Sequence, residues 1–188
     1  MQRFVLGFIV AILVLAAVGL AVVFTGAFNV AASVPHTGLE TWVLSTTMRN
    51  SVRRHAEGIA VPASIGEDQV REGFAQYRQS CVYCHGGPGV DPADWAQGFT
   101  PEPPFLPDTV RRWRPQDLFW IVKNGIKMTA MPAFGGHLDD RQIWGVVGFI
   151  QRLPDMPAET YERLGREADQ PAQPGGTGAP SSAATPGG

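Results

Sequence analysis

The sequence is poor in cysteine and has no excess of positive charge. Its 188 residues include two cysteines, and 15 basic residues stand against 17 acidic ones, for a net charge of −2. This balance leaves no electrostatic case for nucleic-acid binding. The two cysteines, Cys81 and Cys84, have no other thiol partners, and a disulfide between residues three apart would close almost no loop and add little stability.

The two cysteines share one pentapeptide, CVYCH at residues 81–85. Two thiols one helical turn apart can each bond a vinyl group of one porphyrin. His85 follows directly and can point its imidazole at the iron from the same face. This order of residues is typical of c-type haem attachment.

Two other uses of a CxxC pair fit the sequence less well. A thioredoxin-like redox pair would need a strand-turn-helix context with alternating βα patterning, and none is visible. A zinc site of four ligands would need a second pair at similar spacing. The remaining histidines, His36, His55 and His137, are isolated. The pentapeptide therefore indicates haem.

Near the N-terminus lies an unbroken apolar run from Phe4 to Phe24, with no charged or polar side chain. About 20 such residues span the hydrocarbon of a bilayer, whereas the apolar part of a cleaved signal peptide is usually about 7–15 residues. Residues 30–32 could pass as a small-residue cleavage site. The length favours an uncleaved anchor.

Charge around this run predicts its orientation. Arg3 precedes it, and no lysine or arginine follows until Arg49. Because positive residues stay on the cytoplasmic side, the rest of the chain is expected outside the cytoplasm.

A connector follows the apolar run, and Leu39, Trp42, Val43 and Val52 recur in it at near-helical spacing. One interpretation is an amphipathic helix on the membrane surface, with arginines 49, 53 and 54 toward anionic head groups. The other is a helix packed on the core, with a solvated arginine face. The apolar stripe is equally compatible with both interpretations.

The region after the connector has three helical patterns. The first opens at residues 67–68, runs into the CxxCH and stops at the GGPG of residues 86–89. The second covers 118–125, and the third begins at 138–140 and ends at residues 153–154. Gly73 lies inside the first pattern at a cost of about 1 kcal/mol against alanine, which indicates a close neighbour.

These residues resemble the class I c-type cytochromes. The resemblance covers about residues 66–155: a helix carrying G-x3-Y-x3-C-x2-CH from Gly73, a Met-Pro segment within 122–135, and a C-terminal helix. It implies an all-α, small cytochrome c fold around one covalent haem c, attached through Cys81 and Cys84.

The residues alone leave three candidates for the second axial iron ligand: Met128, Met131 and His137. Met131 precedes a proline and stands far enough after His85 to reach the opposite haem face. The resemblance implies that His85 and Met131, the methionine directly before proline, are the axial ligands. A thioether ligand raises the reduction potential and closes the iron to oxygen, which favours electron transfer.

The resemblance has three further implications. A backbone carbonyl near Pro103-Pro104 is expected to accept a hydrogen bond from the ligand histidine, although these prolines could simply stiffen a loop. The C-terminal helix is expected to cross the first one, with Phe149 near Gly73. One arginine among 111, 112 and 114, or the Trp113 N–H, could pair with a haem propionate, although such a cluster is usually a solvated face.

The sequence thus predicts four parts: a transmembrane anchor at 1–28, a connector at 29–65, a cytochrome c domain at 66–157, and a polar, disordered tail at 158–188 with a short helix over 160–167. We expect a one-electron carrier on the periplasmic side of a bacterial inner membrane, with redox proteins as partners. The alternatives are a dedicated electron-transfer subunit of a membrane dehydrogenase or oxidase, a haem enzyme or gas sensor with an open iron site, and a thiol-disulfide protein without haem.

Overall fold

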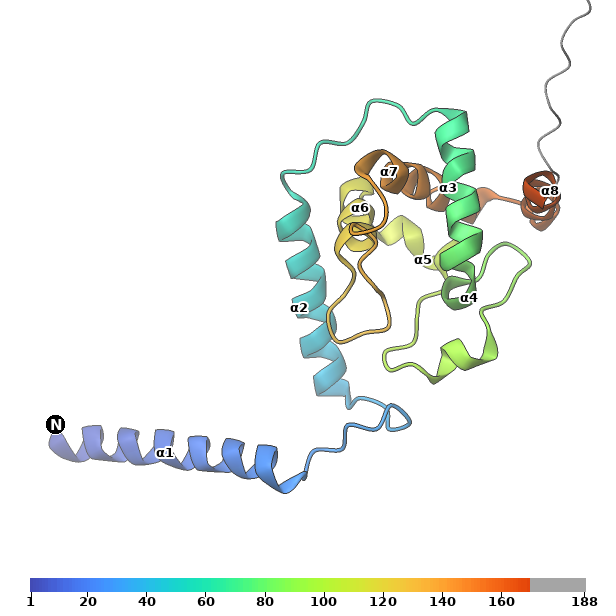
Figure 1. The fold of residues 1–188 in the computed structure, drawn as a ribbon. Helices are drawn as coiled ribbons and strands as arrows, with labels where there is room; N and C mark the ends of the chain where they lie inside the picture. The colour runs from blue at the N-terminus through green and yellow to red at the C-terminus, as the bar shows by residue number, and fades with distance from the viewer. Residues whose placement is uncertain (170–188) are drawn as a thin grey trace, which may run out of the picture.

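The computed structural model describes residues 1–169, and all regular structure in that range is helical (Figure 1). The predicted all-α class is therefore confirmed. The longer helices are α1 (Gln2–Thr25), α2 (Gly38–Ala56), α3 (Glu67–Ser80), α6 (Pro115–Asn124), α7 (Asp140–Ile150) and α8 (Ala158–Asp169). Between them lie the short helices α4 (Val82–His85) and α5 (Leu106–Thr109) and the 3-10 turns η1 (Asp94–Gly98), η2 (Val110–Arg112) and η3 (Leu153–Asp155).

Helix α1 is the apolar N-terminal segment. Its most apolar window has a mean hydropathy of 3.0, and none of its residues is buried. By length and composition it could cross a bilayer, but a signal sequence would pass the same test. Its role as an anchor stays a prediction.

Helix α2 forms most of the connector, and it begins with a capping box. The Thr37 hydroxyl accepts from the Glu40 N–H at 3.3 Å, and the Glu40 carboxylate accepts from the Thr37 N–H at 2.7 Å. The second half buries Val52 and Ala56 and packs against α6, whereas Trp42 in the first half is 64% exposed. Packing on the core, one of the two predicted alternatives, therefore applies to the second half.

Helices α3 and α7 cross in close contact through two glycines. A Cβ built on Gly73 would lie 2.1 Å from the Gly145 carbonyl oxygen, so nothing larger than glycine fits there. The predicted crossing of the two helices is confirmed, but the Gly145 backbone, and not the Phe149 ring, occupies the space at Gly73. The ring of Phe149 packs instead on Phe74 and Tyr77, with centroid distances of 5.0 and 5.2 Å. The backbones approach too closely at the glycine for an aromatic ring to stand between them.

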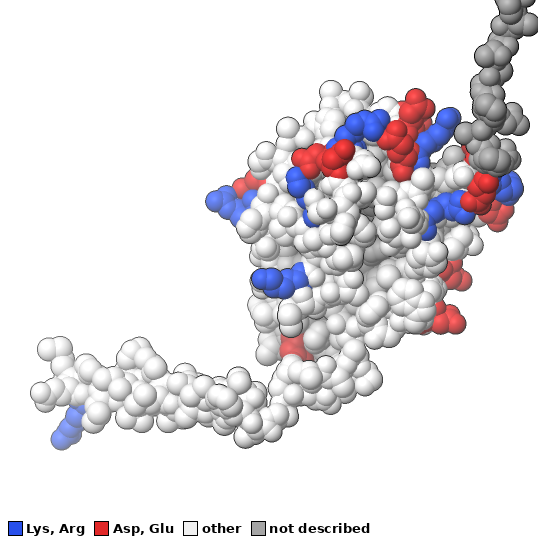
Figure 2. Space-filling model, in the orientation of Figure 1, with Lys and Arg blue, Asp and Glu red and all other residues white. Residues whose placement is uncertain are grey.

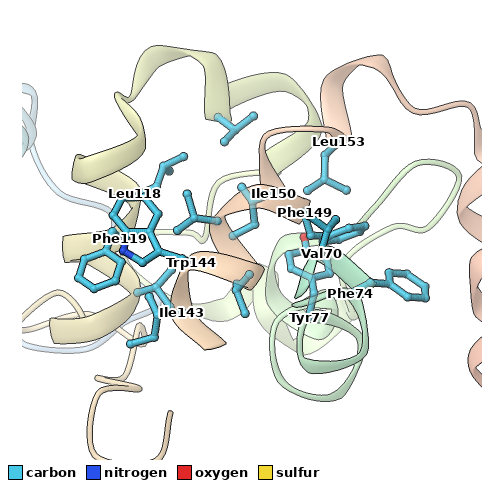
Figure 3. Close-up of a cluster of buried hydrophobic side chains, with 14 of the residues drawn as sticks. Val70, Phe74, Tyr77, Leu118, Phe119, Ile143, Trp144, Phe149, Ile150 and Leu153 are labelled. Atoms are coloured by element: carbon cyan, nitrogen blue, oxygen red, sulfur yellow. The ribbon is translucent and has the colours of Figure 1, made fainter. Parts of the chain in front are cut away.

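The core extends from this crossing to α6 (Figure 3). Phe119 on α6 stacks on Trp144 of α7 at 4.5 Å, and the apolar faces of both helices are buried. This packing fixes α6 relative to α3 and α7, and thereby fixes the elements that carry the candidate site.

Helix α8 corrects the predicted tail. Residues 158–169 form a helix that packs on the core instead of a disordered segment, and it is longer than the short helix expected over 160–167. Tyr161 is 5% exposed and meets Phe74 edge-on at 5.5 Å, while Arg78 pairs with Asp169 at 3.0 Å. One buried tyrosine in a polar stretch supplies the apolar contact. Residues 170–188 of the predicted tail lie outside the described part of the chain.

Candidate haem site

A cavity of about 520 Å³ is lined by residues of α2, α4, α6 and the loop that follows α6. Four residues that line it are Cys81, Cys84, His85 and Met131. The first and last of these are 50 residues apart in the sequence. The structure therefore brings the four predicted site residues together around one space.

The cavity walls suit a large apolar ligand. Aliphatic and aromatic side chains supply most of the lining, and polar groups are the minority. The apolar lining residues include Met48, Leu106, Leu118, Ile121, Val122, Ile126, Phe134 and Ile150. This donor set of thiols, imidazole and thioether within an apolar wall fits a covalently attached haem.

The ring of His85 is oriented by the proline loop, which also forms part of the cavity lining. Its Nδ1 lies 2.8 Å from the Pro104 carbonyl oxygen, which can only accept, so Nδ1 carries the proton. Burial lowers the pKa of His85, although the bond to Pro104 opposes the shift. The ring is therefore neutral, with Nε2 unprotonated and available to a metal. The hydrogen bond expected near Pro103-Pro104 is confirmed at Pro104.

The thiols of Cys81 and Cys84 lack the electrostatics of a redox pair. Burial, and then the neighbouring Cys84, raise the pKa of Cys81 to about 12, and burial also raises the pKa of Cys84. A thiol-disulfide protein needs a lowered pKa so that a thiolate can attack. Within residues 1–169, no group of three or more His, Cys, Asp or Glu side chains could hold a metal ion, so a zinc site gains no support either.

Backbone contacts at several points hold the loop that carries Met131. The Met131 N–H donates to the Thr129 hydroxyl at 3.1 Å, and the Met131 carbonyl accepts from the Ile126 N–H at 3.2 Å. Gly125 has a φ of 66°, and a Cβ there would lie 2.7 Å from the Met131 carbonyl oxygen. The chain therefore turns back on itself at Gly125 and sets Met131 against the cavity.

The other two ligand candidates lie elsewhere. Met128 is 91% exposed at the loop tip, with a left-handed φ of 62°, and it does not line the cavity. His137 is exposed beyond the loop and is also absent from the lining. Of the three residues that the sequence left open, only Met131 lines the cavity.

Three exposed arginines, Arg49, Arg53 and Arg112, line the cavity, and we call the part of the lining that they form its mouth. Among the predicted propionate candidates, Arg112 and Trp113 line it, whereas Arg111 pairs with Asp155 and Arg114 with Asp117. Helix α2 adds Arg49 and Arg53, along with the apolar Met48. The sequence showed the arginines of the connector as a cluster, but nothing in it connected Arg49 and Arg53 to the haem motif.

The chain resembles known proteins over the same region. Residues 68–150 match the family "Cytochrome C oxidase, cbb3-type, subunit III". Dihydro-heme d1 dehydrogenase of Pseudomonas aeruginosa is 29% identical over 82 residues, which are 44% of this chain and 15% of that protein.

A chain from a reducing HAO-like protein complex of Kuenenia stuttgartiensis is 23% identical, with a TM-score of 0.43 over 50% of this chain and 47% of that one. This structural likeness is too distant to add to the sequence match. From the family match and the helical architecture, we conclude that the chain contains a cytochrome c family domain with covalently bound haem c and iron at residues 68–150.

Proposed function

We propose that the protein is a one-electron carrier. Cys81 and Cys84 hold the haem through thioether bonds, and His85 and Met131 are the axial iron ligands. One observation carries the proposal: His85, with Nδ1 engaged by Pro104, and Met131 line the same apolar cavity. When bound, the haem iron supplies the chemistry by cycling between its ferric and ferrous states.

The residues around the cavity suit electron transfer because they fix the two iron ligands and exclude water. The bond to Pro104 fixes the plane of the His85 ring and raises its basicity as a ligand. The hydrogen-bonded loop holds Met131 at the cavity, where its thioether would be the second iron ligand and would leave no open site for oxygen. The apolar walls exclude water, so few groups need to reorganise when the charge on the iron changes.

We further propose that α1 stays in the membrane as a single span and holds the haem domain on the periplasmic side of a bacterial inner membrane. Its length and the position of Arg3 before it support this arrangement. Intact-mass measurement of the membrane-extracted protein tests it, because cleavage near residues 30–32 would remove the span.

A dedicated electron-transfer subunit of a larger complex is the second candidate. It is favoured by the two similarities in sequence, one to a family of oxidase subunits and one to a dehydrogenase. A subunit would co-purify with a large partner in a fixed ratio after detergent extraction, whereas a free shuttle would be recovered alone.

Substitution of Met131 and of Met128, one at a time, tests the proposed iron ligands. Met131→Ala should open the iron, so that the ferrous protein binds carbon monoxide rapidly without denaturant and its reduction potential falls. Met128→Ala is the matched control, since this side chain is 91% exposed, and it should change neither property. The reverse pattern, or rapid binding by the unchanged protein, would overturn the ligand assignment.

A further inference from the structure

The arginines at the cavity mouth differ from most other basic residues of the described chain in lacking carboxylate partners. Ten of the 15 lysines and arginines have an Asp or Glu oxygen within 4.0 Å. In the described chain the five others are Arg3, Arg49, Arg53, Arg112 and Lys127, and residues 170–188 contain no Asp or Glu. Three of these five, Arg49, Arg53 and Arg112, line the candidate haem cavity.

Two of the three come from α2, at the spacing of one helical turn. Arg49 and Arg53 are four residues apart and therefore lie on one face of the helix. Val52 and Ala56 are buried against the core, so apolar packing sets the position of this face. Arg54, the next residue, does not line the cavity and pairs with Glu57 at 2.9 Å.

The nearby carboxylates do not neutralise these charges. Asp117 lies close enough for Arg53 to help lower its pKa, but Arg114 already engages both Asp117 oxygens, at 2.7 and 2.9 Å. Glu102 is the one acidic residue in the lining, and it forms no ion pair within residues 1–169. Figure 2 shows blue atoms over the middle of α2 set apart from red ones, whereas blue and red atoms touch along the upper edge.

Several like charges at the mouth of an apolar cavity form an anion site. A planar guanidinium matches a carboxylate with two parallel hydrogen bonds, and such pairs are strongest beside low-dielectric walls. The group proposed to fill this cavity carries two carboxylates, its propionates. The apolar walls suit its ring, and the basic mouth suits those carboxylates.

We propose that Arg49 and Arg53 of α2, together with Arg112, bind the haem propionates. This proposal rests on the proposed function. Its new content is that α2, which lies outside the matched residues 68–150, is part of the haem site. The helix between the apolar segment and the cytochrome domain then closes the cavity on the side of α6 and holds the haem carboxylates in their ionised form.

Charge-removing variants of the full-length, haem-loaded protein test the assignment. Arg49→Gln and Arg53→Gln should lower the midpoint potential, because loss of a nearby positive charge favours the ferric state. The control is Arg54→Gln, which removes the same charge from the next residue of the same helix. We expect the shift in Arg53→Gln to be at least about twice that in Arg54→Gln, with Arg53→Lys restoring most of the potential.

A second measurement reports the position of α2 and not only the charge. Amide hydrogen exchange across residues 38–56 should become about tenfold faster in the Arg49→Gln, Arg53→Gln double variant, because the helix loses its hold on the haem. Exchange in Arg54→Gln should match the unchanged protein.

The outcomes separate this proposal from the proposed function. The propionate site alone would be overturned if the α2 variants and Arg54→Gln had equal midpoint potentials and equal amide hydrogen exchange. The haem in these proteins would still be covalently attached, and its iron would still be closed to carbon monoxide. Absence of covalent haem on a denaturing gel of the unchanged protein would overturn both.

Discussion

Replacing Gly73 with alanine tests the helix crossing on which the haem motif depends. The new methyl would lie 2.1 Å from the Gly145 carbonyl oxygen, whereas a carbon–oxygen contact needs about 3.3 Å. The helices must therefore separate by about 1.2 Å, because the atom in the way is backbone and cannot rotate aside. Alanine gains about 1 kcal/mol in helix propensity, and overpacking of this kind costs about 1–3 kcal/mol or more. Because the clash is with backbone, the cost lies at the upper end of this range, and we expect a net loss of about 2 kcal/mol in the free energy of unfolding.

Urea unfolding of the ferric, haem-loaded protein measures this loss. Helix α3 leads directly into the CxxCH, so its displacement should also weaken the long-wavelength absorption band that reports a methionine ligand on ferric haem. Gly165→Ala in α8 is the matched control, since its nearest neighbour is the Arg78 guanidinium at 3.7 Å, an ordinary contact. That variant should gain about 0.5–1 kcal/mol. An unfolding free energy for Gly73→Ala equal to or above that of the unchanged protein would refute the close crossing.

Two further predictions concern the ligand loop and α6. Thr129→Val removes both the acceptor for the Met131 N–H and the donor to the Ile126 carbonyl. Because Met131 is then held less firmly, added imidazole should bind the ferric haem about tenfold more tightly. Unchanged imidazole binding would show that these hydrogen bonds do not hold the loop. In Asp117, burial alone would raise the carboxyl pKa, but the hydrogen bonds and charge of Arg114 outweigh it and lower the pKa. A carboxylate with a lowered pKa stabilises the fold above its unfolded pKa, about 4, and loses this effect as the pH falls through the folded value. Urea unfolding should therefore show Asp117→Asn to be about 1–2 kcal/mol less stable at pH 7, with a gap that narrows below about pH 4; a constant gap down to about pH 3 would contradict the assignment.

The sequence was most informative where chemistry is local. The CxxCH pentapeptide, the breaker after it and the Met-Pro segment are short patterns whose geometry follows from a few bonds. The apolar periodicity predicted α3, α6 and α7, because each buries one face. The resemblance added the carbonyl partner of His85, which the structure has at Pro104.

The rest depends on which helix meets which, and the sequence does not encode this locally. Gly73 revealed a close contact but not its partner, since Gly145 has no side chain to form an apolar pattern. Tyr161 lies in a polar stretch, so a single buried ring was hidden by its neighbours. Arg49 and Arg53 reach the cavity only because α2 folds back against α6, and their spacing fits a membrane surface equally well.

The short link between α1 and α2 has a consequence for how often the haem meets its partners. Twelve residues, 26–37, join the end of α1 to the start of α2, and a fully extended chain of that length reaches about 40 Å. With α1 in the bilayer, as we propose, the haem domain stays within that distance of the membrane. A partner embedded nearby then meets it at an effective concentration on the order of millimolar, without any increase in intrinsic affinity. Their encounter becomes a search in two dimensions, and weak docking is enough to sustain turnover.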